Sequence, residues 1–455
     1  MVFQNNLLMG AASISSDAAY TVDYSCRFND DDSAYMQRTF EAGNDELFSV
    51  SFWFKWGNLT DGTFLNAESG ASSRWRYDTA TQKLQIYSVG ASSYVYGNPV
   101  FRDPNAWYHF LLVWDLSEVS GNRVQWYVNG VRITATNSTE PTSSSTYVIN
   151  TAIAHEIGSR EGSSIFLDGY LSQYCFIDNA AKLPTDFGEF SNGVWRPIDI
   201  TGLDYSGTNS FLLDFADSAD LGNDVSGNNN DWTTSGLAAN DQVTDTPTTN
   251  FSTWSPIDKS SSVTLSDGNL VATFPSSWYN GRATFSIPSS GKWSLQIQST
   301  VEPFYIGIVA PGQTDGDVDT SGTDALYYYG NEANFRTYRT GSAVNETTNV
   351  PPKVGTNTNM EFLIDKDNDQ IGAVIADTVY MAVDSGLAIQ DNMTKIFTSG
   401  LSGATTTDFG QGGYVPSQTG YKALSTANLP EPTIKDSKKY FDTILYAGNG
   451  TGQKV

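Results

Sequence analysis

Two apolar runs joined to a tight return constrain this fold more than any other feature of the sequence. In the run 124–128, valine and tryptophan alternate with polar residues, and this period of two indicates a half-buried β-strand. Asn129 and Gly130 follow, and both residues tolerate the positive φ angles of a two-residue type I′ turn. We therefore predict a β-hairpin in which Val131 and Ile133 return to the buried side of the sheet.

The preceding run, 105–115, is apolar at both parities, which predicts a central strand with both faces covered. Only 16% of the residues are charged while 13% are aromatic, a composition typical of β-rich, loop-rich proteins. No helical period separates the apolar runs. We therefore predict an all-β chain of two tandem β-sandwiches. The further strands are predicted at 48–56, 83–89, 155–159 and 165–178 in the first sandwich, and at 291–298, 303–310, 324–330 and 360–375 in the second.

A chain of 455 residues is too long for one ordinary core, and its composition changes suggest five parts. A connector rich in Asp, Asn, Gly and Ser separates the two strand series, and Trp232, Phe251 and Trp254 predict that it packs onto a neighbour. The parts are an N-terminal anchoring arm (1–20), the first sandwich (21–200), the linker (201–255), the second sandwich (256–414) and a C-terminal segment (415–455).

The chain carries 25 basic and 50 acidic residues, a net charge of −25 that disfavours nucleic acid or an anionic membrane as partner. No segment approaches the roughly 20 apolar residues that span a bilayer, and the N-terminus lacks the basic region of an export signal. We therefore expect synthesis in a cytoplasm and release by lysis. Cys26 and Cys175 are too few for a disulfide framework, and we predict free thiols, although one sandwich could bring them together.

The residues that catalysis would need are scattered. Glycosidases use a pair of carboxylates, but Glu156 and Asp168 each stand alone in their predicted strands. The two histidines, His109 and His155, accompany no Cys/His/Asp set, and no phosphate-binding glycine loop is present. We therefore predict a protein that is not an enzyme and requires no cofactor.

Two clusters of side-chain oxygens are candidates for binding Ca²⁺. Asp30, Asp31 and Asp32 are consecutive in the first cluster, and Asp224 and Asp231 bracket the second. The alternative for both is a set of turns capped by Asx side chains. The acidic stretch 365–372 is predicted to be a hairpin tip, because its glycine is misplaced for an EF-hand loop.

Glycan binding requires exposed aromatic rings beside amide, carboxylate or guanidinium groups. Trp75 and Tyr77 alternate with Arg74 and Arg76, which makes this stretch the first candidate. Trp53 is a second candidate, because it lies opposite the packed parity of its strand. The alternative is that these rings cover a subunit or interdomain contact.

Two family resemblances rest on motifs in order. Residues 22–180 resemble a laminin-G/pentraxin-type concanavalin A-like lectin domain through CRFNDDDSAYM, FSVSFWFKW, NAWYHFLLVWD, VQWYVNGVRI and FLDGYLSQYCFID. Residues 256–414 resemble a SPRY-type sandwich through GKWSLQI, YIGIV, DALYYYG and FLIDKDNDQIG. The two sandwiches are joined by DVSGNNNDW and followed by GYKALSTANLPEPTI. In this combination nearly the whole chain is similar to fibre-like virion proteins of tailed phages.

This resemblance implies a structural virion component, either a tail fibre or a capsid-attached decoration. It also implies that the N-terminal arm contacts other virion proteins and that sister subunits form a homo-oligomer. The lectin resemblance implies that His109 is structural. Host-surface glycans are the implied external partner, and family members often extend beyond this length, so the chain resembles a short form. The alternative function is a carbohydrate-active enzyme or a free carbohydrate-binding protein.

Overall fold

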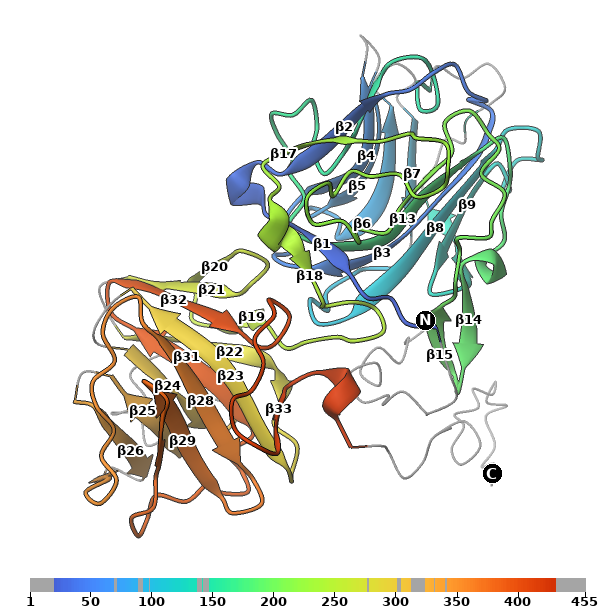
Figure 1. Ribbon diagram of the computed structural model, residues 1–455. Helices are drawn as coiled ribbons and strands as arrows, with labels where there is room; N and C mark the ends of the chain where they lie inside the picture. The colour runs from blue at the N-terminus through green and yellow to red at the C-terminus, as the bar shows by residue number, and fades with distance from the viewer. Residues whose placement is uncertain are drawn as a thin grey trace, which may run out of the picture.

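The two predicted strand series form two β-sandwiches that lie side by side (Figure 1). The computed structural model describes residues 20–68, 72–88, 93–97, 99–136, 141, 147–275, 278–300, 304–311, 324–330, 332–339 and 342–430. The anchoring arm apart from Tyr20, and the C-terminal segment beyond residue 430, lie outside these residues. No helix in the described part of the chain is long and apolar enough to span a bilayer.

The first sandwich consists of two antiparallel sheets, and every predicted strand of the first series is present. One sheet has the order β10-β9-β8-β3-β13-β1-β18, with β16 also paired to β13; the other has the order β11-β7-β6-β5-β4-β12-β2-β17. The strands of the first sheet are β1 (Ser25–Phe28), β3 (Leu47–Trp56), β8 (Trp107–Asp115), β9 (Val124–Val128), β10 (Val131–Ile133), β13 (Gly169–Asp178), β16 (Phe211–Leu213) and β18 (Gln242–Val243). Those of the second are β2 (Tyr35–Thr39), β4 (Gly62–Glu68), β5 (Ser72–Asp78), β6 (Lys83–Ser88), β7 (Ser93–Gly97), β11 (Ala135–Thr136), β12 (Ala154–Ile157) and β17 (Thr233–Ser235).

The second sandwich has the same two-layer design. Its sheets have the orders β19-β22-β31-β24-β25-β26-β27 and β20-β21-β32-β23-β28-β29-β30, and β33 (Tyr421–Ala423) adds to β23 in parallel. The first sheet contains β19 (Trp254–Lys259), β22 (Tyr279–Ser286), β24 (Phe304–Val309), β25 (Ala325–Tyr329), β26 (Asn334–Arg339), β27 (Ser342–Asn345) and β31 (Lys395–Gly400). The second contains β20 (Thr264–Ser266), β21 (Val271–Phe274), β23 (Lys292–Ser299), β28 (Asn359–Asp365), β29 (Gln370–Ile375), β30 (Thr378–Met381) and β32 (Gly403–Asp408).

Strand alternation places the core of the first sandwich between its sheets. Phe48, Val50, Phe52, Phe54 and Trp56 all enter this core from β3, as their period of two predicts. The opposite face of the sheet is covered as well, because β8 contributes a second apolar cluster that packs under the segment 180–212. The prediction that the 105–115 run is buried on both faces is therefore confirmed.

The predicted hairpin has its expected turn but differs in burial. Asn129 and Gly130 have φ angles of 47° and 76°, and Val128 pairs with Val131, as a type I′ turn requires. Val131 is nevertheless 36% exposed and Ile133 is only partly buried. The prediction of burial for Val131 is wrong because β10 is the edge strand of its sheet, where the opposing layer does not reach.

The segment 201–255, which the sequence predicts to be a connector, is largely part of the first sandwich. Its three short strands, β16, β17 and β18, pair with β13, β2 and β1 respectively. Trp232 is buried in the first core, while Trp254 is buried in the second, so the expected packing of these rings is confirmed. The abundant turn residues of this segment serve to connect short edge strands.

A buried cation holds the end of this segment against the first sandwich. The Lys55 ammonium, on the outer face of β3, is completely buried and lies 2.7 Å from the Asp245 carboxylate. It also donates hydrogen bonds to the side-chain oxygen of Asn250 (2.7 Å) and the carbonyl oxygen of Phe251 (2.8 Å). All three ammonium protons therefore have acceptors, which is the condition under which a buried charge is tolerated.

Direct contacts then join the two sandwiches. Arg27 on β1 forms ion pairs with Asp241 (3.1 Å) and with Asp267 (2.9 Å), and the latter belongs to the turn between β20 and β21. In the same turn, the Gly268 carbonyl accepts a hydrogen bond of 2.6 Å from the Tyr170 hydroxyl. The side chain of Asn269 donates to the Gly57 carbonyl (2.8 Å). Polar contacts across this turn therefore dock the second sandwich on the first.

We predict that Lys55→Met destabilises the protein by about 3–5 kcal/mol, because it leaves the Asp245 carboxylate buried without its cation. Urea unfolding measures the change, and Lys422→Met, at an exposed lysine of β33, is the control with an expected change within about 0.5 kcal/mol. Adding Asp245→Asn to Lys55→Met removes the stranded charge and should recover part of the loss. A Lys55→Met protein as stable as the Lys422→Met control would contradict the assigned role of this ion pair.

Candidate functional site

The aromatic rings that we predicted from the sequence to stack against a glycan are buried. Trp75 and Tyr77 are 0% and 1% exposed, and Trp75 packs between the sheets against Phe52 and Trp126. Trp53 is 1% exposed, in a cluster on the outer side of the other sheet. The prediction that these three rings offer a stacking surface is therefore wrong, because none has a face open to a sugar.

The two arginines of this stretch lie on the opposite face of β5. Arg76 donates to the side chain of Gln85 (2.5 Å) and pairs with Asp78 (3.2 Å), while Arg74 is only 5% exposed. Side chains alternate across a strand, so the burial of Trp75 and Tyr77 between the sheets places Arg74 and Arg76 on the outer face. The neighbouring Glu156 carboxylate belongs to the same row, so this face is a closely packed polar layer.

Asp224 and Asp231 were candidates for binding Ca²⁺, but in the structure their carboxylates accept hydrogen bonds from N–H groups of the protein. The Asp224 carboxylate accepts hydrogen bonds of 2.9 Å from the backbone N–H groups of Leu212, Ser226 and Asn230. Asp231 accepts one of the same length from the Asp224 N–H. These are the Asx-capped turns of the alternative interpretation.

The other Ca²⁺ candidates form a short 3₁₀ helix, η2 (Asp30–Asp32). Asp32 accepts a hydrogen bond from the side chain of Asn29 (2.9 Å). Across the described ranges, no three His, Cys, Asp or Glu side chains are grouped closely enough to hold a metal ion. The Ca²⁺ prediction therefore gains no support from either cluster.

Ser51, His109 and the two cysteines of the first sandwich are buried. The Ser51 hydroxyl lies 2.8 Å from Nε2 of His109, but the two residues are 2% and 0% exposed. Burial lowers the pKa of His109 to about 3, so its ring is neutral at physiological pH. Cys26 and Cys175 are free and buried, as predicted, and burial raises the pKa of both thiols. These groups pack the sheet and do not meet solvent.

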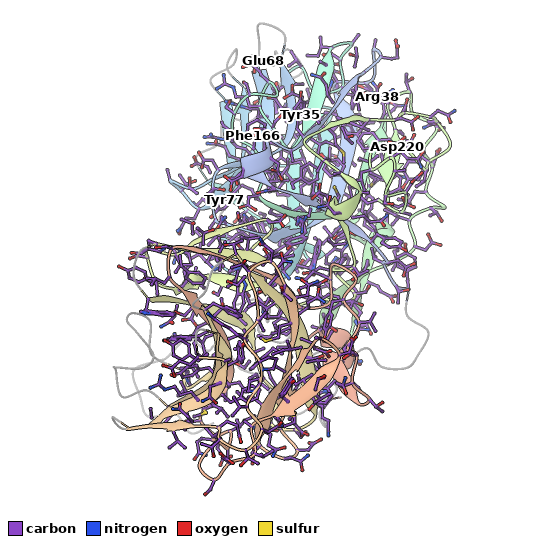
Figure 2. The ribbon with its side chains drawn as sticks, turned by 60° about the vertical axis from the view of Figure 1, so that its left-hand side comes forward. Tyr35, Arg38, Glu68, Tyr77, Phe166 and Asp220 are labelled. Carbon is purple, nitrogen blue, oxygen red and sulfur yellow. The ribbon has the colours of Figure 1, made fainter. Side chains whose placement is uncertain are left out.

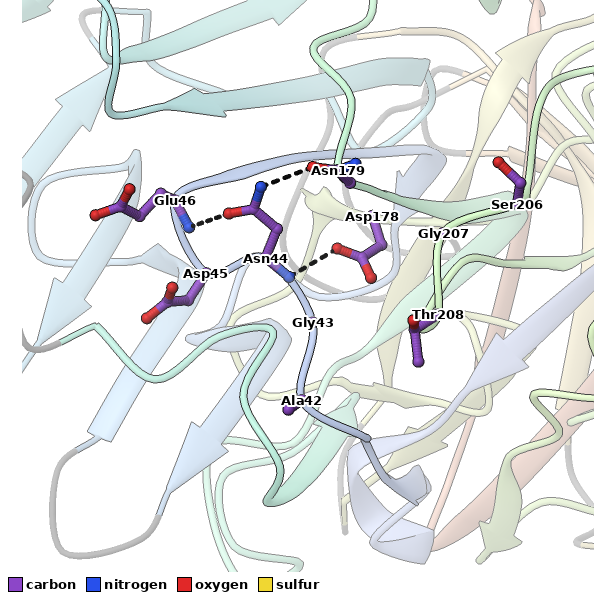
Figure 3. A pocket seen from close by; sticks show the side chains of 10 residues that line it. All are labelled: Ala42, Gly43, Asn44, Asp45, Glu46, Asp178, Asn179, Ser206, Gly207 and Thr208. Carbon is purple, nitrogen blue, oxygen red and sulfur yellow. Dashed lines mark hydrogen bonds between the residues drawn. The ribbon is translucent and has the colours of Figure 1, made fainter.

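An open polar cleft lies at one rim of the first sandwich (Figure 3). Its volume is about 480 Å³, large enough for one or two sugar rings. Three segments meet there: the turn before β3, the end of β13 and the loop before β16. We call this cleft the rim cleft, and it is lined by Ala42, Gly43, Asn44, Asp45, Glu46, Asp178, Asn179, Ser206, Gly207 and Thr208.

Most of the side chains that line the rim cleft are polar, and its walls are tied together. Asn44 donates from its side chain to that of Asn179 (2.7 Å), and its own side-chain oxygen accepts the Glu46 N–H (3.1 Å). The Asp45 and Glu46 carboxylates are exposed at the mouth. The cleft therefore presents amides, hydroxyls and carboxylates, without an aromatic platform.

The floor of the rim cleft is a buried polar network centred on Asp178. This carboxylate, 5% exposed, accepts hydrogen bonds from the N–H of Asn44 (3.0 Å), the side chain of Asn150 (2.6 Å) and the N–H of Asn209 (3.3 Å). Asn209 in turn donates from its side chain to that of Asn150 (2.8 Å). Each side chain of this network is the hydrogen-bond partner of another, so the three segments are fixed to one another.

Two glycines let the chain approach this network closely. A Cβ at Gly43 would lie 2.2 Å from the side-chain oxygen of Asn150, and one at Gly207 would lie 2.4 Å from the Asp178 carbonyl oxygen. No sequence motif marks the rim cleft, because its residues come from three separated turns. The only sequence signal is the density of Asn, Asp, Gly and Ser in each of them.

We predict that Asp178→Ala destabilises the protein by at least about 3 kcal/mol, because three buried donors lose their acceptor. Thermal or urea unfolding measures this loss. Asp45→Ala, at the exposed mouth of the same cleft, is the matched control and should change stability by about 0.5 kcal/mol or less. Equal effects of the two substitutions would refute the network as the support of the cleft.

Comparison with known proteins agrees with this fold. Residues 30–182 match a family model described as the concanavalin A-like lectin/glucanases superfamily. They lie within the first sandwich, which is therefore similar to the domains of that superfamily. No curated protein sequence matches the chain.

Three solved structures illustrate the structural likeness. The SPRY domain of human HERC1 is 11% identical, with 34% of this chain and 96% of that chain covered and a TM-score of 0.28. A Bacteroides ovatus protein described as a putative carbohydrate binding protein is 16% identical over 47% of this chain and 58% of its own, with a TM-score of 0.34. The carbohydrate-binding module CBM66 of Bacillus subtilis is 9% identical over 34% of this chain and 91% of its own, with a TM-score of 0.25. At these identities the likeness is one of fold alone.

Proposed function

We propose that this chain is a structural display protein of a tailed-phage particle, a tail fibre or a capsid-attached decoration, that contacts host-surface glycans through the rim cleft. The observation that carries the proposal is an open polar cleft whose floor is a network of hydrogen bonds centred on the buried side chains of Asp178, Asn150 and Asn209. Such a site is formed before any ligand arrives, so little binding energy is lost in ordering it. The docking of the two sandwiches supports a display role, because it orients the cleft relative to the rest of the chain.

The chemistry of the rim cleft favours a neutral glycan. The amides of Asn44 and Asn179 and the hydroxyls of Ser206 and Thr208 match the donors and acceptors of sugar hydroxyls. The exposed Asp45 and Glu46 carboxylates disfavour sialic or uronic acids, as does the net charge of −25. Without a stacking ring, a single site binds weakly, so useful adhesion requires several copies on one particle.

We predict that Thr208→Trp, which fills the rim cleft, abolishes glycan binding, and that Asp45→Ala weakens it at least about tenfold. A glycan array with neutral and acidic sugars identifies the ligand, and calorimetric titration of the best neutral hit measures its affinity. The control is Asp220→Ala, at an exposed aspartate that does not line the rim cleft. Figure 2 shows Asp220 and the buried Tyr77 on opposite flanks of the first sandwich. Unchanged binding by the Thr208→Trp protein would remove the cleft as the glycan site.

The particle role has a separate test. We expect the chain to be present in purified phage particles at a fixed copy number, measured by quantitative mass spectrometry against the major capsid protein. A free monomer that is absent from particles and hydrolyses a polysaccharide would instead support the alternative, a carbohydrate-active enzyme.

A further inference from the structure

One of the buried carboxyl groups near the junction of the two sandwiches has no ion-pair partner in the part of the chain that the structure describes and is only partly hydrogen-bonded. Asp168 immediately precedes β13 and is 3% exposed. One of its oxygens, Oδ2, accepts hydrogen bonds from the side chain (2.7 Å) and the backbone N–H (3.2 Å) of Asn58. The other oxygen, Oδ1, is buried without a hydrogen-bond partner among the described residues. This carboxyl group is therefore only half satisfied.

The unpartnered oxygen faces backbone rather than solvent. A Cβ added at Gly57 would lie 2.2 Å from Oδ1 of Asp168, so Gly57 leaves just enough room for the carboxyl group. The Gly57 N–H also donates to the Asp168 carbonyl oxygen (3.1 Å). Oδ1 therefore lies against the Gly57 backbone, and a charge on it would gain no hydrogen bond from the described residues.

The turn that holds Asp168 is also the turn that binds the second sandwich. The side chain of Asn58 donates both to Asp168 and, at 3.1 Å, to the Leu265 carbonyl at the β20–β21 hairpin. The Gly57 carbonyl accepts from the side chain of Asn269, and the Asn269 carbonyl accepts the Trp254 N–H (2.9 Å). Any displacement of residues 57–58 therefore acts directly on the docking contacts.

The charges around Asp168 disfavour its ionised form. Burial, followed by the charge of Asp30 in η2, raises its pKa to about 7, with Asp31 adding to the effect and the hydrogen bonds from Asn58 opposing it. On the second sandwich, the acid of the docking turn is Asp267, which is paired with Arg27. The titratable or charged groups of the surrounding elements are Arg27, Asp30, Asp31, Tyr170 and Asp267.

We propose that Asp168 is a proton-dependent latch between the two sandwiches, tight while its carboxyl group is protonated and looser once the group ionises. Undocking would release residues 57–58 and let water reach the carboxyl group, which would then ionise near its ordinary pKa of about 4. Protonation therefore favours docking, fully so below pH of about 4, and this stabilisation is lost as the pH rises through about 7. Each unit of difference between the two pKa values is worth a factor of about ten in the docking equilibrium.

Amide hydrogen exchange of the full chain at pH 5 and pH 8.5 tests this proposal, after correction for intrinsic exchange rates. The informative amide is that of Gly57, which donates to the Asp168 carbonyl oxygen, and Leu295 in the middle of β23 is the internal control. We expect protection at Gly57 to fall at least about tenfold at the higher pH, while protection at Leu295 changes little. Equal protection of Gly57 at both values would overturn the latch.

Two variants separate the latch from a merely structural role. Asp168→Asn keeps the shape and the acceptor oxygen but cannot ionise, so its protection should be the same at both pH values. Asp30→Asn removes a neighbouring charge and should move the midpoint of the change to lower pH. Asp220→Asn should keep the wild-type profile. If Asp168→Asn does not fold by circular dichroism, the Asp30→Asn protein decides, and an unshifted midpoint refutes the proposal.

Discussion

The burial of one ammonium group governs how this chain is assembled. A lysine in the middle of a strand, on a face that is covered, must find acceptors for three protons or destabilise the fold. The acceptors for Lys55 come from Asp245, Asn250 and Phe251, nearly two hundred residues later in the chain. Those residues lead directly into Trp254 and the second sandwich, so the solvation of one charge sets where the second domain begins.

The same use of polar side chains recurs through the molecule. Asp178 accepts three N–H donors beneath the rim cleft, and Asp224 closes a loop with three backbone N–H groups. Many aspartates and asparagines of this chain are thus internal acceptors that tie turns to sheets. The acidic composition reflects this use as well as the solubility of the surface. Among the aspartates that the structure describes, Asp168 differs because its Oδ1 is buried without a hydrogen-bond partner, and we propose that this makes the junction sensitive to pH.

The alternating pattern of the strands predicts much of this fold, since strand period is a local property. The 48–56 and 124–128 runs and the Asn129–Gly130 turn formed as expected. The pattern could not predict which parity of a strand meets the core, and Trp75 therefore faces inward where a stacking ring was expected. The rim cleft could not be predicted from the sequence. Its floor forms only when Asn44, Asn150 and Asp178, which are far apart in the sequence, come together in the fold.

The central claim is that the two sandwiches form one cooperative structure through the buried polar contacts at their junction. Differential scanning calorimetry of the full chain at pH 5 tests it most directly. We expect a single transition whose calorimetric and van't Hoff enthalpies agree. Two resolved transitions, or a calorimetric enthalpy about twice the van't Hoff value, would show two independent domains on a tether and contradict it.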